Sequence, residues 1–214
     1  MRFCVLILLL VSACTHVRPK KVPGETDIQV EAVEFVGKDG KKLQLDPGEI
    51  RDWLGQRART LIQTNRWYNP FRVNEDQRRV TAWWQDKGYF DVVVTEGKRK
   101  FRKTDDGEKV TITWVIDEGP KSTIADIQMR FFPPGTEDEA RSKIDFSVGD
   151  DVELNLQRLR RWEMAAVVQE AGYAHAKVYS RAFVDRKQRK VFHWFYADPG
   201  PGTFIKSLKV EGNS

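Results

Sequence analysis

Residues 110–129 read V-T-I-T-W-V-I-D-E-G-P-K-S-T-I-A-D-I-Q-M, a β stretch that ends in Gly-Pro and leads at once into a second short strand. The same order returns at residues 191–201, V-F-H-W-F-Y-A-D-P-G-P, followed by the apolar spacing of Ile205, Leu208 and Val210. Alternation of apolar and polar residues indicates strands with one buried face. Two copies of one ordered pattern predict a repeated unit.

Each copy is preceded by a helical run that ends in Gly-Tyr, at Gly88-Tyr89 and Gly172-Tyr173. The spacing of the short strand after Gly-Pro also occurs near the start of the chain, beginning at Val30. From Val30 to residue 124 and from residue 124 to residue 205 the intervals are 94 and 81 residues, so each unit is the size of a domain. The alternative is a coincidence between two unrelated α+β domains, because Gly after a helix and Gly-Pro turns are each common.

The expected order is β-α-α-β-β in both copies, which gives an α+β fold of two tandem units, each a three-stranded mixed sheet packed on a helix pair. Asp46-Pro47 with Glu49 predicts the start of the first helix and Asn74 the start of the second. Residues 104–107, Thr-Asp-Asp-Gly, predict a hairpin turn. The expected strands are 28–36 with a small irregularity, 90–101, 109–117, 124–132, 174–184 and 190–197, and the expected helices are 47–62, 74–87, 137–144 and 152–171.

The N-terminus has the features of an export signal. Arg2 is followed by an apolar run too short to span a bilayer. The run closes with Val11-Ser-Ala-Cys14, which resembles a bacterial lipobox and implies that Cys14 becomes the acylated first residue. Because Cys4 is the only other cysteine, the mature chain would carry no disulfide. The alternative is an ordinary signal peptide with a chance cysteine.

The sequence predicts five segments. Residues 1–13 form the signal peptide, and residues 14–26 form a lipidated N-terminus and a linker without apolar periodicity. Residues 27–120 and 121–201 form two domains, and residues 202–214 form the first strand of a further one. The residues expected to define the units are Gly88, Tyr89, Gly119, Gly172, Tyr173 and Gly200.

The ordered pattern resembles tandem POTRA domains, the polypeptide-transport-associated units of BamA-type and TamA-type outer-membrane assembly proteins. The resemblance rests on a helix ending in Gly-Tyr, a strand pair, the closing Asp117-Glu-Gly-Pro120 and the strand after it, and it covers residues 28–214. The second copy departs from it with Asp198-Pro-Gly-Pro. The lipobox also departs from it, because BamA-like proteins usually carry a plain signal peptide. The resemblance implies a non-enzymatic scaffold without cofactors, held on the periplasmic face of the outer membrane by its lipid. It also implies a membrane β-barrel beyond residue 214, unless the chain is a separate lipoprotein.

A three-stranded sheet with a free edge suits β-augmentation, in which an extended client adds a strand through main-chain hydrogen bonds. By the resemblance, the free edge is the strand that follows Gly-Tyr, and unfolded outer-membrane proteins and other subunits of the assembly machine are the expected partners. The alternative is an envelope lipoprotein that binds division proteins or peptidoglycan. The residues expected at the client-binding edges are Val92, Val94, Lys98, Arg99, Ala176, Val178 and Arg181.

Other functions find little support in the sequence. No metalloprotease, nucleophile-elbow or phosphate-loop motif occurs, and the two histidines of the expected second domain, His175 and His193, lack carboxylate partners for a metal. The net charge is +5, but an exported chain would not meet nucleic acid. The seven tryptophans suggest glycan binding as a further hypothesis. Core positions are expected for Trp83, Trp114, Trp162 and Trp194, and exposed positions for Trp53, Trp67, Tyr68 and one of Trp83 and Trp84.

Overall fold

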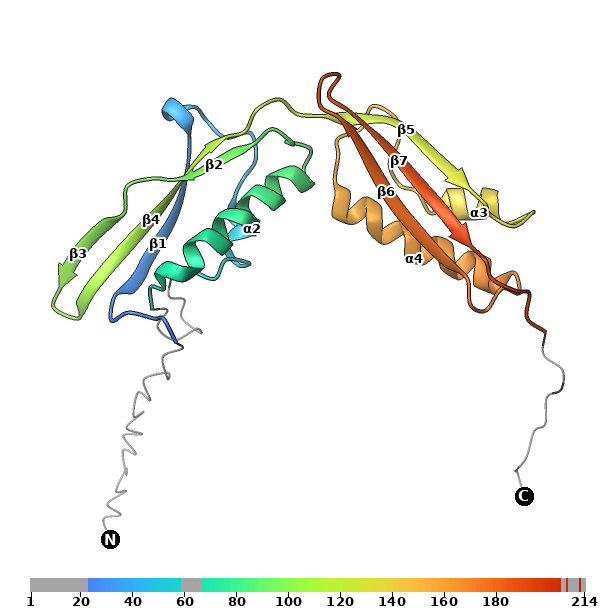
Figure 1. The fold of residues 1–214 in the computed structure, drawn as a ribbon, viewed down its shortest axis with the longest axis horizontal. Helices are drawn as coiled ribbons and strands as arrows, with labels where there is room; N and C mark the ends of the chain where they lie inside the picture. Colours follow the sequence, from blue (N-terminus) through green and yellow to red (C-terminus); the bar gives the residue numbers. More distant parts are fainter. Residues whose placement is uncertain (1–22, 59–66, 205–206, 208–211, 213–214) are drawn as a thin grey trace, which may run out of the picture.

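The computed structural model describes residues 23–58 and 67–204 together with residues 207 and 212, and these form two domains with the same layout (Figure 1). In each, a mixed sheet lies over helices, and its first strand pairs in parallel with its last strand. Cys14 and the apolar positions of the expected third opening strand lie outside the described residues.

The first domain begins with β1 (Gln29–Gly37), the 3-10 turn η1 (Lys38–Gly40) and α1 (Gly48–Arg51). The turn η2 (Pro70–Arg72) leads into α2 (Val73–Asp86), and the sheet is completed by β2 (Val93–Glu96), β3 (Lys100–Thr104) and β4 (Gly107–Asp117). The strand order is β1-β4-β2, and β3 also pairs with β4. The core joins the inner face of this sheet to α2 through Val80, Trp84, Ile112 and Trp114.

The second domain consists of β5 (Thr123–Arg130), α3 (Glu137–Ser142), α4 (Leu154–Glu170), β6 (Lys177–Asp185) and β7 (Lys190–Asp198). Its strand order, β5-β7-β6, matches that of the first domain. The expected irregularity of the opening strand is confirmed, with a register shift between Val30 and Ala32, and β5 has the same shift between Ile124 and Asp126. Because both copies contain this bulge, we infer that it is a regular feature of the repeated unit.

The expected helix over 47–62 is wrong, because α1 ends at Arg51 and the described residues after it are not helical. The side chain of Asp76, fully buried in α2, accepts hydrogen bonds from the backbone N–H groups of Gly55 (2.6 Å) and Gln56 (2.7 Å). These bonds take the N–H groups that would otherwise continue the helix. The cap expected at Asn74 is wrong as well, since Asn69 accepts from the N–H of Phe71 at the start of η2.

Three aromatic expectations are also wrong. Trp194, expected in the core, lies half-buried on the outer face of β7. Tyr68 is buried, with its ring under the guanidinium of Arg99, and Trp162 is 64% exposed. The inward side of α4 is instead made by Met164, Ala165 and Val168. The periodicity of α4 was too weak to place Trp162 correctly, because apolar residues occur around most of the helix.

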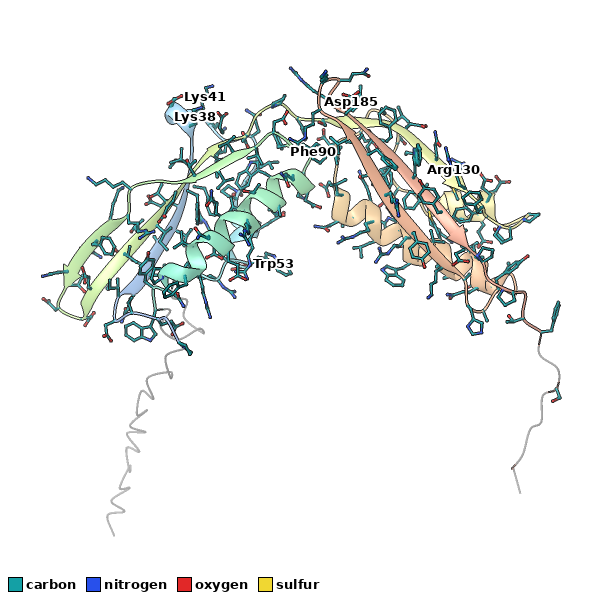
Figure 2. All side chains as sticks on the ribbon, in the orientation of Figure 1. Lys38, Lys41, Trp53, Phe90, Arg130 and Asp185 are labelled. Atoms are coloured by element: carbon teal, nitrogen blue, oxygen red, sulfur yellow. The ribbon has the colours of Figure 1, made fainter. Side chains whose placement is uncertain are left out.

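The two domains meet at a joint built around Phe90. This side chain follows Gly88-Tyr89 of the first domain and lies where the two domains meet (Figure 2). It packs with Ile124, Val152 and Val191 of the second domain. The carboxylate of Asp86, at the end of α2, accepts a hydrogen bond of 2.7 Å from the backbone N–H of residue 155. It therefore caps the first turn of α4, which has no side-chain cap of its own.

Candidate functional site

The strand order leaves β2 and β3 at one edge of the first sheet and β6 at the corresponding edge of the second. The opposite edges are partly covered where they begin. The N–H of Tyr68 bonds to the carbonyl of Ile28 (2.7 Å), and the N–H of Ile124 bonds to the carbonyl of Asp150 (3.0 Å). Unpaired backbone groups at a sheet edge can receive another strand, so β2, β3 and β6 form the candidate site.

The edge of the first sheet is broken, and the expected continuous strand over 90–101 is wrong. Glu96 is paired with Trp114 and Lys100 with Thr111, so three edge residues stand opposite two residues of β4. Gly97 occupies this bulge and donates its N–H to the carbonyl of Thr113 at 2.7 Å. The break leaves strands of four and five residues, which are short templates for an added strand.

Side chains hold the bulge in place. The guanidinium of Arg99 forms a two-pronged ion pair with Glu96, whose hydrogen bonds raise the pKa of Arg99. The amide of Gln77 in α2 donates to the carbonyl of Val94 at 2.7 Å. Arg99 is therefore matched within the domain, as are Lys100, which lies beside Glu34, and Arg102, which lies beside Glu31. The exposed Lys98 and Lys103 of the same edge take part in none of the ion pairs among the described residues.

The edge of the second sheet is continuous. All nine residues of β6 pair with β7 in one unshifted antiparallel register, from Lys177 opposite Asp198 to Asp185 opposite Lys190. Val178 faces the core, whereas Tyr179, Arg181 and Phe183 are exposed. The second domain thus offers the longer template for strand addition.

The structure places the expected edge residues in three settings. Val92 and Ala176 are buried just before β2 and β6, after short turns in which their N–H groups bond to the carbonyls of the Gly-Tyr tyrosines. Val94 and Val178 are buried within the strands. These four residues anchor the edges to the cores and expose little side chain to a partner. Lys98 and Arg99 lie in the bulge, and Arg181 is exposed on β6.

The Gly-Tyr and Gly-Pro positions shape the ends of each domain. Gly88, Gly119, Gly172 and Gly200 all have positive φ, between 63° and 98°, a conformation that glycine adopts without strain. The carbonyl of Gly88 accepts from the N–H of Ser122, and the carbonyl of Gly172 accepts from the N–H of Thr203 at 2.8 Å. Tyr89 is buried and Tyr173 half-buried. The same connection thus closes both domains.

A groove of about 700 Å³ runs beside β6, and sequence reasoning missed it. One side is α4, with Arg161, Trp162 and Ala165, and the other is the start of β6, with Ala176 to Tyr179. The missed signal is the exposed Trp162 on the side of α4 that adjoins the free edge.

The outer face of the second sheet was also missed. Phe192, Trp194 and Tyr196 alternate along β7 on the face away from the helices, and the guanidinium of Arg130 lies 4.3 Å from the Trp194 ring centroid. Their i, i+2 spacing could have revealed them. The equivalent positions of β4 are Thr111, Thr113 and Val115, so the two domains differ on this face.

His193 is not a surface ligand. It is 1% exposed on the inner face of β7, beside the rings of Phe146 and Phe195, and its Nε2 lies 3.3 Å from the hydroxyl of Ser180. Burial lowers its pKa to about 4. His175 is exposed at the start of the groove. Within residues 23–58 and 67–204, no three His, Cys, Asp or Glu side chains are placed to hold a metal ion.

None of the helices in the described part of the chain has the length and apolar character needed to cross a membrane. Residues 28–119 match the model of the POTRA family, described as surface antigen variable number repeat. No curated protein matches the chain in a sequence comparison.

Among solved structures, the chain is similar to domains POTRA3-5 of BamA from Haemophilus influenzae, with a TM-score of 0.51 and 18% identity over 90% of this chain and 75% of that chain. It also matches BamA from Haemophilus ducreyi lacking POTRA domains 1-3, at 13% identity and a TM-score of 0.44 over 79% of this chain and 29% of that chain. POTRA1-3 of the periplasmic domain of Omp85 from Anabaena matches at 19% identity and a TM-score of 0.39, over 80% of this chain and 62% of that chain. The fold comparison rests on the first of these.

Proposed function

We propose that the chain is built of POTRA domains and serves as a periplasmic scaffold of an outer-membrane protein assembly or translocation factor. The first domain is matched by the family model at residues 28–119, and the second has the same fold. Its role is to bind unfolded client or partner proteins by β-augmentation. The observation that carries this proposal is β6, an unbroken nine-residue edge strand.

Strand addition suits a receptor for many clients, because main-chain hydrogen bonds do not depend on the client's sequence. An edge that is permanently available also risks aggregation between copies. The two domains meet this risk differently. The first breaks its edge with the bulge at Gly97, and the second places the charged side chains of Lys177 and Arg181 along a continuous edge.

The joint between the domains supports a scaffold that holds its edges at fixed positions. Phe90 inserts into the apolar cluster of the second domain, and Asp86 caps α4. On the surface of the joint, Arg186 of the β6–β7 hairpin lies 3.3 Å from Asp91, and Lys87 lies 3.4 Å from Glu153. Apolar burial together with a directional hydrogen bond restricts both the separation and the rotation of the domains.

The lipobox at the N-terminus supplies the proposed anchor. We propose that Cys14 carries the lipid and that the segment up to residue 26 tethers the first domain to the outer membrane. Each buried methylene of an acyl chain contributes about 0.8 kcal/mol, so two or more chains hold a protein stably at a bilayer.

Site-specific photo-crosslinking in cells tests the proposed function. A photoreactive amino acid is placed at Tyr179, which is 50% exposed on β6, and at Leu156, which is 53% exposed on α4 away from the free edge. We expect unfolded precursors of outer-membrane barrels to be captured from position 179 and not from position 156. Capture of division proteins or glycan at position 179, without barrel precursors, would contradict the proposal.

A further inference from the structure

The groove beside β6 combines an apolar floor with aromatic walls. Ala165, Ala176 and Val178 form the floor, and Trp162 and Tyr179, which are 64% and 50% exposed, stand on its two sides. An extended segment added to β6 would place alternate side chains toward the helix side, because successive residues of a strand face opposite ways. A large apolar side chain facing that way would enter the groove.

The groove also carries two cations that are free of carboxylate partners. Among the described residues, no ion pair involves Arg161 or Lys177, and the guanidinium of Arg161 lies 4.8 Å from the ring centroid of Trp162. Asp198, which also lines the groove, stands opposite Lys177 across the strand pair without forming an ion pair with it. The neighbouring Arg160 is in contrast engaged by Asp145 and Glu163.

Arg161 and Lys177 both lie beside the path that the backbone of an added strand would follow. Arg161 belongs to α4, on the helix side of the free edge, and Lys177 is exposed at the start of β6. They therefore lie on opposite faces of an added strand. Arg161 lies on the face toward α4, and Lys177 lies on the outer face, because the adjacent Val178 is buried against the helices. In the broken edge of the first domain, Arg99, Lys100 and Arg102 already have carboxylate neighbours. Lys98 and Lys103 of that edge are exposed and belong to none of the ion pairs among the described residues.

We propose that the groove between α4 and β6 selects extended client segments in which a large apolar residue has one carboxylate residue next to it and a second carboxylate two residues away on its other side. This inference rests on strand addition to β6 and names the chemistry of the client. The apolar side chain fills the groove beside Trp162. The carboxylate two residues away points to the same face and meets Arg161, and the adjacent carboxylate points to the outer face and meets Lys177. The backbone supplies general affinity, and the groove supplies preference among clients.

The test compares two blocked octapeptides of alternating Thr and Val with one central Phe, in which the residue next to Phe and the residue two positions away on its other side are either both Asp or both Asn. Binding to the full chain is measured by fluorescence anisotropy. Exposed ion pairs contribute about 0.2–1 kcal/mol each, so we expect the Asp peptide to bind about three- to tenfold more tightly than the Asn peptide. Higher salt should reduce this ratio.

The double variant Arg161→Gln with Lys177→Gln should bring the two peptides within twofold of each other. The control, Arg158→Gln with Lys187→Gln, removes the same charge from exposed positions on α4 and the β6–β7 hairpin and should keep the preference. Equal binding of both peptides by the unmodified chain, or a preference that survives in the groove variant, would overturn the inference about client chemistry but not strand addition itself. Failure of both peptides to bind would overturn strand addition and the inference with it.

Discussion

Truncation of Phe90 to alanine tests whether the joint couples the two domains. Phe90 is 9% exposed and belongs to an apolar cluster with Ile124, Val152 and Val191 of the second domain. Phe→Ala substitutions in cores cost about 3–5 kcal/mol. Because this cluster is small and lies at a domain boundary, we expect the lower end, about 3 kcal/mol.

The loss of stability should fall on the second domain, although residue 90 follows α2 of the first domain. Hydrogen exchange followed by mass spectrometry measures the stability of each domain separately. At 1.4 kcal/mol per factor of ten, about 3 kcal/mol corresponds to roughly hundredfold faster exchange of the slowest amides in β5 and β7. Amides of α2 and β4 should change much less.

Val93→Ala is the matched control, because Val93 lies three residues further on and is 55% exposed. It should leave exchange in both domains near that of the unmodified chain. If Phe90→Ala accelerates exchange equally in β4 and β7, or leaves β7 unchanged, the assignment of Phe90 to the core of the second domain is wrong.

Three further predictions concern the two cores and the anchor. Burial holds the pKa of His193 at about 4, below the ordinary 6.5, so the unfolded chain binds more protons between these values and stability falls as pH falls. Urea unfolding should show a loss of about 2 kcal/mol from pH 7.5 to pH 5, and a His193→Gln variant that loses as much would refute this origin. Asp76→Ala should lower the free energy of unfolding by about 3 kcal/mol, since it leaves the N–H groups of Gly55 and Gln56 without an acceptor and removes one of the two carboxylate partners of Arg79. Glu75→Ala, which removes only an exposed partner of the same arginine, should cost less than about 0.5 kcal/mol in the same assay. Cys14→Ser should abolish incorporation of labelled fatty acid and release the chain from the membrane fraction, whereas labelling that persists in this variant would exclude Cys14 as the acylated residue.

The fold class could be predicted from local sequence features, each of which lies within one helix or strand. Gly88 and Gly172 end helices in a conformation that favours glycine, and the alternation along residues 110–116 and 191–197 marks the central strand of each sheet. Even the bulge in the opening strand could be predicted, because Val30 and Val33 are out of phase for a regular strand and both are buried. These signals act within one element, so a single sequence reveals them.

The errors arose where contacts distant in sequence decide the structure. The carboxylate of Asp76 stops the first helix from 20 residues away, and no local signal near Gln56 indicates it. The break in the edge strand depends on how Gly97 meets Thr113 of the neighbouring strand. The groove beside β6 arises only when α4 is packed against the sheet, which places Trp162 beside the free edge. The sequence could therefore predict which strands lie at the free edges. It could not predict that the first edge is broken and the second is continuous.

The central claim is that β6 receives a client strand through its outward backbone groups. In an antiparallel pair, adjacent residues direct their N–H groups alternately toward the partner strand and away from it. Of the two substitutions Tyr179→Pro and Ser180→Pro, one therefore removes an N–H that bonds to β7, and the other removes an N–H that faces outward.

Binding of an extended client peptide to these two variants, measured beside their circular dichroism spectra, is the most direct test. We predict that one variant loses stability because its pairing with β7 is broken. The other should keep the folded spectrum and lose peptide binding by at least tenfold. A proline variant that stays folded and binds the peptide as tightly as the unmodified chain would contradict strand addition at β6.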